Sequence, residues 1–213
     1  MNIVNRKLSL SDFKAYISSF NFSPLNPTKI VLHHTWRPTV EQWQGQRSIN
    51  GLKTFYEGKG WSAGPHLFIG EDGIWLFTPM NQTGIHASEG NYKSIGIEIV
   101  GDYDKAVWQG EIKKNVVGVV KALMEKLRIK DDMIKFHRDY STKTCPGTAI
   151  TKEWVLTLLH ESSEDPMKRK ELEDDLAHKV NEAQSALERA NEARERLALF
   201  KGVPVKKYFI KDE

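Results

Sequence analysis

The segment from residue 136 to residue 147, FHRDYSTKTCPG, brings together side chains that could bind a metal ion. It holds the only cysteine of the chain, Cys145, with His137 eight positions before it and Lys143 two positions before it. Histidine nitrogen and cysteine thiolate are good zinc ligands, but two of them need a third. His33, at the end of a short apolar run, offers that third ligand. Three protein ligands leave the fourth position open for water, as in catalytic zinc sites.

Each of these residues also has an ordinary structural explanation. A lone cysteine is commonly a small buried hydrophobe, and a histidine on a strand is commonly a hydrogen-bonded core residue. Lys143 and the Cys-Pro-Gly turn make the combination more specific than any single member. The spacing alone leaves both interpretations open.

Alternating helices and strands must position these side chains. Hydrophobic periodicity and turn residues predict the strands 29–33, 66–69, 74–77 and 94–100, and residues 134–137 lead into the His137 motif. They predict helices over 9–20, 39–57, 110–128 and 151–159, with Ser9 or Ser11 as the first N-cap. The expected fold class is α/β, with one mixed central β-sheet flanked by helices.

One of these strands carries a carboxylate on a face that should be buried. Within 94–100, the isoleucines at 95, 97 and 99 share one face, and Gly96 and Glu98 share the other. A buried carboxylate is costly unless it has a partner or a task. Glu98 is therefore a candidate catalytic group, and pairing with Lys143 or Arg138 is the structural alternative.

The composition changes near Ser162, which divides the chain into an expected domain over 1–161 and an appendage over 162–213. Residues 166–200 are rich in Glu, Lys, Arg, Ala and Leu, with a partial heptad pattern, which predicts one long charged helix. Gly202 and Pro204 should end it, before a short tail. The heptad positions that would face a partner helix are mostly alanine and include Lys179. We expect the helix to dock on its own or a neighbouring molecule, and a homo-oligomer formed through it is possible.

Charge and composition exclude several classes of function. The net charge is +3; residues 161–213, with 11 Lys+Arg and 13 Asp+Glu, contribute −2, which leaves +5 for the rest. This is too weak to indicate nucleic-acid binding, and no long apolar run predicts membrane insertion. A single cysteine requires no oxidising compartment, and the N-terminus lacks the apolar core of a secretion signal. We therefore expect synthesis in the cytoplasm without a signal peptide.

Five motifs occur in an order that resembles the type 2 N-acetylmuramoyl-L-alanine amidases. They are VLHHT, GPHLFIGEDGIW, GIHAS, NYKSIGIEIVG and FHRDYSTKTCPG, and the resemblance covers roughly residues 28–160. The family includes zinc amidase lysozymes of phages, AmpD-like amidases and peptidoglycan recognition proteins. The resemblance implies an α/β zinc hydrolase that cuts the amide between N-acetylmuramic acid and L-alanine in peptidoglycan.

Carried over residue by residue, the resemblance assigns roles at the site. One Zn²⁺ would be bound by His33, His137 and Cys145. Glu98 would act as general base and then acid, and Lys143 would stabilise the oxyanion. The chain departs from many relatives at Pro65, where they have a tyrosine, and this places more weight on Glu98.

Four further residues are candidates for binding the peptidoglycan or muropeptide substrate. His86, in GIHAS, resembles a substrate-contacting histidine beside the zinc. His66 could line the cleft or pack within the strand. Trp36 and Trp61 lie in expected loops and are the better candidates for stacking on sugars.

Three functions remain open at this stage. A wall-directed amidase without a signal peptide resembles a phage or prophage endolysin, released to the cell wall through a holin. A cytoplasmic amidase that recycles soluble muropeptides is the alternative within the enzyme class. A non-catalytic peptidoglycan-binding module is the third, although the presence of Cys145 argues against it.

Overall fold

A computed structural model describes residues 1–161 and 166–202, and the side chains of the C-terminal helix from residue 174 onward. The chain divides into two units, Met1–Glu161 and Ser162–Glu213, which are considered separately. The expected tail beyond Gly202, with Pro204, and the side chain of Leu172 lie outside the described residues.

The first unit is built on a six-stranded mixed sheet with strand order β1-β4-β3-β5-β2-β6. Strands β3, β5, β2 and β6 are parallel, and β4 and β1 add antiparallel neighbours at one side. The strands are β1 (Arg6–Leu8), β2 (Lys29–His34), β3 (Leu67–Gly70), β4 (Gly73–Leu76), β5 (Ser94–Ile99) and β6 (Ile134–Phe136). The expected α/β fold class is confirmed.

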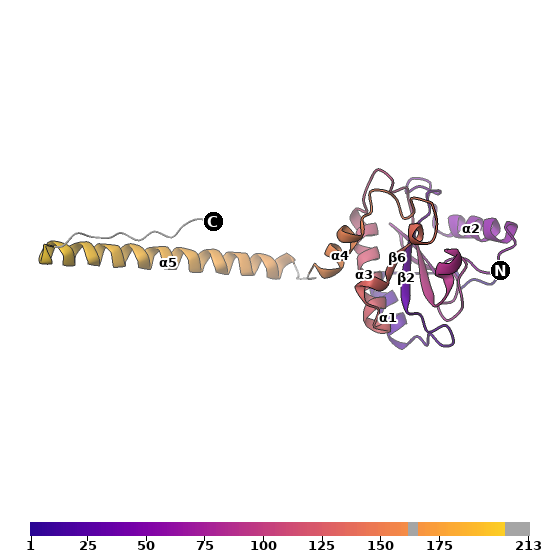
Figure 1. The fold of residues 1–213 in the computed structure, drawn as a ribbon, viewed down its shortest axis with the longest axis horizontal. Helices are drawn as coiled ribbons and strands as arrows, with labels where there is room; N and C mark the ends of the chain where they lie inside the picture. The colour runs from indigo at the N-terminus through magenta and orange to yellow at the C-terminus, as the bar shows by residue number, and fades with distance from the viewer. Residues whose placement is uncertain (162–165, 203–213) are drawn as a thin grey trace. The chain divides into compact units, whose positions relative to one another are not determined.

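Helices cover both faces of the sheet. Helices α1 (Leu10–Ser19) and α3 (Gly110–Leu127) lie side by side on one face, and α2 (Gln46–Gly58) lies on the opposite side (Figure 1). Helix α4 (Lys152–His160) packs beside α3. The first helix begins as expected, because the Ser9 hydroxyl accepts a hydrogen bond from the Asp12 amide at 3.1 Å.

Strand alternation sends alternate side chains into two different cores. Leu32, Ile95, Ile97 and Ile99 join the larger core under α1 and α3. The opposite face carries Phe68, Trp75 and Phe77, which pack with Ile49 and Tyr56 of α2 in a smaller core. His33 and Glu98 alternate with residues of the larger core, so they lie on the α2 side.

One predicted element began at the wrong residue, and one strand was not predicted. The second helix begins at Gln46 rather than residue 39, because Gly45 has φ +53° and ψ −121°, which a helix cannot contain. The residues before it form a loop in which the Trp43 indole donates to Asp72 at 2.8 Å. Strand β1 was not predicted; three residues are too few to show a period.

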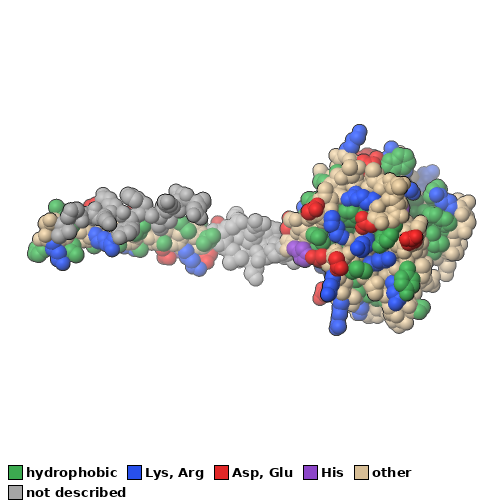
Figure 2. Space-filling model, in the orientation of Figure 1, with side chains coloured by type: hydrophobic (Ala, Val, Ile, Leu, Met, Phe, Trp, Pro, Cys, Tyr) green, Lys and Arg blue, Asp and Glu red, His purple; other side chains and the backbone are tan. Residues whose placement is uncertain are grey.

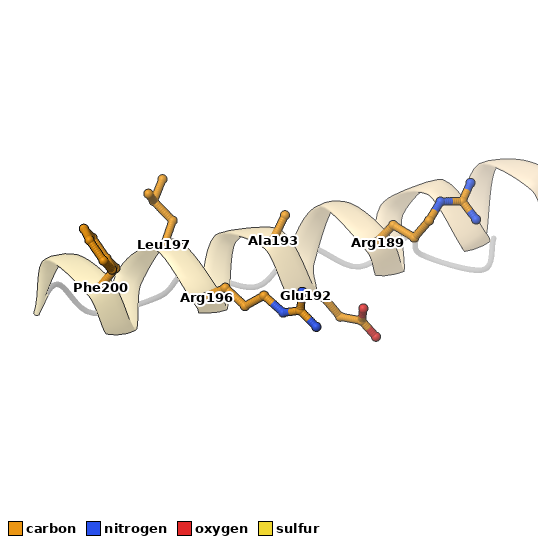
Figure 3. Close-up of a pocket in the computed structure, with 6 residues that line it drawn as sticks. All are labelled: Arg189, Glu192, Ala193, Arg196, Leu197 and Phe200. Carbon is orange, nitrogen blue, oxygen red and sulfur yellow. The ribbon is translucent and has the colours of Figure 1, made fainter.

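The second unit contains helix α5, Pro166–Lys201, as the composition predicted. Gly202 follows with φ +63°, the left-handed conformation that commonly ends a helix. Ala193, Leu197 and Phe200 project from one side of α5, and Glu192 and Arg196 from another (Figure 3). Among the described helices, none is long and apolar enough to cross a membrane.

Candidate metal centre and active site

Three neighbouring strands deliver three of the candidate residues to one edge of the sheet. In the parallel pairing of β2 with β5, His33 lies opposite Glu98. On the other side of β2, Leu32 lies opposite Phe136, and His137 follows at the end of β6. The carboxyl ends of parallel strands are where α/β proteins commonly place their sites.

The fourth residue, Cys145, comes from a loop that is braced from within. The Arg138 amide donates to the carbonyl of Cys145 at 2.9 Å, and the Arg138 guanidinium donates to carbonyls of Thr144, Gly147 and Ile150. Gly147 has φ +114°, and a Cβ there would lie 2.3 Å from backbone atoms of Tyr103. The loop therefore passes close to the backbone of Tyr103 and holds the Cys145 thiol against His33.

The three expected ligand side chains converge. One donor atom from each of His33, His137 and Cys145 lies within 4.8 Å of the others. The Cys145 Sγ is 3.7 Å from His33 Nδ1. A tetrahedral zinc ion with ordinary bond lengths needs donors roughly 3.4–3.6 Å apart, so Cys145 and His33 are already near that spacing and the widest pair would close by roughly 1 Å.

The protonation of this cluster also suits a cation. Burial lowers the pKa of His33 well below its ordinary value, with further lowering by His86 and His137, and burial lowers the pKa of His137. Both rings are therefore neutral near pH 7, with a lone pair free to bind metal. Burial raises the pKa of the Cys145 thiol, but a bound cation would bring the thiol to its thiolate form. The His34 amide already points at this sulfur, 3.3 Å away. The donor set fits zinc.

Glu98 lies beside this cluster with part of its carboxylate unsatisfied. Its Oε1 is 3.9 Å from His33 Nδ1, and its Oε2 is buried without a hydrogen-bond partner among the described residues. Burial raises the pKa of Glu98 to about 8, against the opposing charge of Lys143. The alternative pairing with Arg138 does not occur, because that guanidinium is turned to the loop carbonyls.

The cluster opens into a cleft of about 580 Å³. Lys143 lies on its wall with an exposed side chain, on the same loop as Cys145. Trp36, which is 57% exposed, and Trp61 also line it. The structure thus brings both tryptophans to the same cleft as the expected metal ligands His137 and Cys145.

The two histidines expected to bind substrate, His86 and His66, are buried. His86 borders the cleft but is only 8% exposed, and its ring lies edge-on to His33 with centroids 5.0 Å apart. His66 is fully buried, accepts from the Gly96 amide at Nδ1 and donates to the Gln82 carbonyl at Nε2. The expectation that His66 binds substrate is therefore corrected, since both nitrogens are used inside the protein.

Part of the cleft wall was missed by sequence reasoning. Phe55 and Tyr56 of α2 line it together with Lys59, the residue after the helix, and Tyr56 stacks on Trp61 with ring centroids 5.4 Å apart and an interplanar angle of 7°. The Lys59 ammonium lies 5.3 Å from the Trp61 ring centroid. The spacing of Phe55, Tyr56 and Lys59 indicates only a helix, so nothing in the sequence separated these wall residues from core residues.

A comparison with protein families agrees with this geometry. The family model described as N-acetylmuramoyl-L-alanine amidase matches residues 23–148, which include all three expected metal ligands, Glu98 and Lys143. The chain belongs to this family. The resemblance inferred from the five motifs is confirmed.

Some relatives of this chain are named as recognition proteins and others as amidases. Peptidoglycan-recognition protein LB of Drosophila melanogaster is 30% identical over 161 residues, which cover 70% of this chain and 67% of that protein. Among solved structures, the N-acetylmuramoyl-L-alanine amidase LysC from Clostridium intestinale is 26% identical with a TM-score of 0.56. That match covers 63% of this chain and 86% of LysC.

A third similar structure was determined with a ligand. It is a variant of Drosophila PGRP-LB in complex with tracheal cytotoxin, 25% identical with a TM-score of 0.54, covering 60% of this chain and 79% of the other. The family thus includes relatives named for cleavage and relatives named for recognition.

Proposed function

We propose that this protein is a zinc-dependent amidase that cleaves the bond between N-acetylmuramic acid and L-alanine in bacterial peptidoglycan. The observation that carries the proposal is the meeting of His33, His137 and Cys145 with a largely buried carboxylate, Glu98, where three parallel strands end beside the Cys145 loop. Family membership and the similarity to LysC support it.

His33, His137 and Cys145 would hold the ion. A zinc ion bound there supplies Lewis-acid chemistry, which lowers the pKa of a water molecule and polarises the scissile carbonyl.

Glu98 performs the proton transfers. Because burial raises its pKa to about 8, the carboxyl group binds a proton readily near neutral pH and can also release it. It takes a proton from the attacking water and later gives it to the leaving amine of L-alanine. Its unpartnered Oε2 leaves one oxygen free for this task.

Lys143 supplies positive charge where negative charge develops. Lys143 lines the same cleft as His137 and Cys145, so its ammonium can stabilise the oxyanion of the tetrahedral intermediate. Trp36 and the stacked pair of Trp61 and Tyr56 offer flat apolar surfaces for sugar rings. We place the glycan there.

Zinc stoichiometry combined with mass analysis of digested peptidoglycan tests the proposal. The wild-type protein should bind one zinc and release peptides that begin with a free L-alanine amine. Cys145→Ser replaces the thiolate by a hydroxyl that binds zinc poorly, so it should lose most metal and most hydrolysis. Full zinc occupancy with undiminished hydrolysis in that variant would contradict the ligand assignment.

A non-catalytic recognition module is the second candidate, because several relatives are named as recognition proteins. In that case the wild-type protein would bind muropeptide and release no product. If the protein cleaves, lysis of purified sacculi set against turnover of soluble muropeptides separates an endolysin from a recycling amidase. We favour an endolysin that reaches the wall after holin-type release.

A further inference from the structure

The two ring nitrogens of His33 face different surroundings. Nδ1 faces the other expected ligands, 3.7 Å from Cys145 Sγ and 3.9 Å from Glu98 Oε1. Nε2 lies 3.0 Å from His86 Nδ1, in the protein interior. Only one of these nitrogens carries the proton of a neutral imidazole, and a metal ligand must be the one without it.

A chain of hydrogen bonds decides which nitrogen that is. The Ser94 hydroxyl lies 3.0 Å from the Asn91 carbonyl, which can only accept, so the hydroxyl hydrogen points there. Ser94 Oγ must then accept from His86 Nε2, 3.2 Å away. With its proton on Nε2, His86 has a bare Nδ1, which accepts from His33 Nε2. His33 Nδ1 is left unprotonated, with its lone pair directed at the cluster.

The fold holds the His86 ring in this place from several sides. A Cβ on Gly96 would lie 2.5 Å from the ring, and a Cβ on Gly84 would lie 3.0 Å from it. The Asn91 side-chain oxygen accepts from the amides of His86 and Ala87 at 2.9 and 2.7 Å. The ring therefore occupies a slot that only glycines leave open, on a loop tied by the same asparagine.

We propose that His86 is a positioning residue that fixes the tautomer and orientation of His33, with Ser94 as the end of the relay. This inference rests on the proposed function, because it assigns His33 Nδ1 as the ligand atom. Metal-bound histidines commonly donate their second ring N–H to an acceptor, which orients the ring. Here the acceptor is a second histidine, whose own proton is fixed by Ser94. The role differs from the substrate contact expected from the sequence.

Zinc affinity, measured by competition with a chelator, tests the relay. His86→Leu removes the acceptor while filling the slot, and should weaken zinc binding by about 10- to 100-fold. Ser94→Ala leaves the acceptor but frees the tautomer of His86, and should produce a smaller loss in the same direction. His86→Asn places an amide oxygen near the position of Nδ1 and should recover part of the affinity.

Nitrogen-15 NMR of the imidazole rings gives a readout that activity does not. In the metal-free wild-type protein at neutral pH, His33 and His86 should both be protonated at Nε2, and Ser94→Ala should mix the tautomers of His86. Thr78→Val is the matched control, because it removes another buried hydroxyl, which bonds to Gly64 away from His33. It should lower the melting temperature without changing zinc affinity.

The outcomes separate this inference from the function on which it rests. If the wild-type protein bound no zinc, the proposed metal centre would be wrong. If it bound zinc and His86→Leu and Ser94→Ala bound equally tightly, or if His33 carried its proton on Nδ1, the metal centre would stand and the relay would be overturned. Because Ser94→Ala changes one atom, a failure of His86→Leu to fold leaves the test intact.

Discussion

Glu98 shows how an environment gives one carboxylate its chemistry. It lies on a strand between apolar neighbours, with one oxygen near His33 and the other without a hydrogen-bond partner among the described residues. Glu98→Gln keeps the shape and removes the ability to exchange a proton. We expect zinc content and melting temperature close to wild type, and a fall in turnover by about 10²-fold or more.

The control for that variant is Glu153→Gln, an exposed carboxylate at the start of α4. It should retain full turnover. Retention of wild-type rates by Glu98→Gln would show that the general base is another residue.

His66 makes the stability of the metal-free protein depend on pH. Burial lowers the pKa of His66 from 6.5 to about 4. Between these values the unfolded chain binds a proton that the folded chain does not, so stability is complete above pH 6.5 and falls as the pH falls towards 4. The full loss from this group is about 3 kcal/mol.

Urea unfolding from pH 4.5 to pH 7.5 measures this contribution. His66→Gln removes the titrating group, so its free energy of unfolding should vary less with pH than that of wild type, whatever its absolute value. Equal slopes for the two proteins would contradict the assignment.

At the residue scale, the sequence predicted much of the site. His137, Cys145, Glu98 and Lys143 line one cleft, and His33 lies against His137 and Cys145, because their motifs combine ligand chemistry with strand ends and one loop. The hydrogen-bond partners of His66 and His86 could not be predicted. Whether a histidine on or beside a strand faces a cleft or an interior partner depends on tertiary contacts, such as the Gln82 carbonyl against His66 and the Ser94 hydroxyl against His86.

At the scale of elements, register does most of the positioning. The alternation in 94–99 correctly separated the face of Glu98 from the isoleucine face, and the parallel pairing then set Glu98 against His33. The start of α2 was misplaced because Gly45 and the Trp43 loop interrupt an otherwise helical pattern. Tertiary contacts of that kind are not encoded in local periodicity.

Two glycines on different elements provide a matched prediction. Gly96→Ala in β5 would place a Cβ 2.5 Å from the His86 ring, so the ring must shift, and we expect a lower melting temperature and weaker zinc binding. Gly51→Ala in α2 meets no atom within 4 Å. It should stabilise the protein by about 0.5–1 kcal/mol, because alanine favours a helix.

Thermal melting of the metal-free proteins and chelator competition measure the two effects. A Gly96→Ala protein as stable and as tight for zinc as wild type would show that the slot around His86 is looser than the structure indicates.

For the whole molecule, the open question is the task of the second unit. Acidic and basic side chains are interspersed on the visible face of the first unit (Figure 2). Helix α5 carries surface ion pairs such as Lys179 with Asp175 at 2.7 Å. Leu197 and Phe200 of α5 are 53% and 91% exposed. Such apolar exposure on a charged helix suits a surface that binds another molecule. The exposed ion pairs add little stability to the helix.

Deleting residues 162–213 tests that role. We expect the truncated protein to bind zinc as before, because all three expected ligands lie in the first unit. Its activity should fall more on whole walls than on soluble muropeptide, and light scattering should show whether mass per particle changes. An unfolded truncation would show that the boundary at Ser162 is wrong.

The braced loop around Cys145 bears on the order in which the protein matures. Arg138 and Gly147 hold the loop through protein contacts, and the histidine ligands stand at strand ends. Small zinc domains, by contrast, need the ion in order to fold. In the zinc amidase that we propose, metal acquisition should therefore follow folding as a separate event, and the folded chain should stay inert until the ion binds.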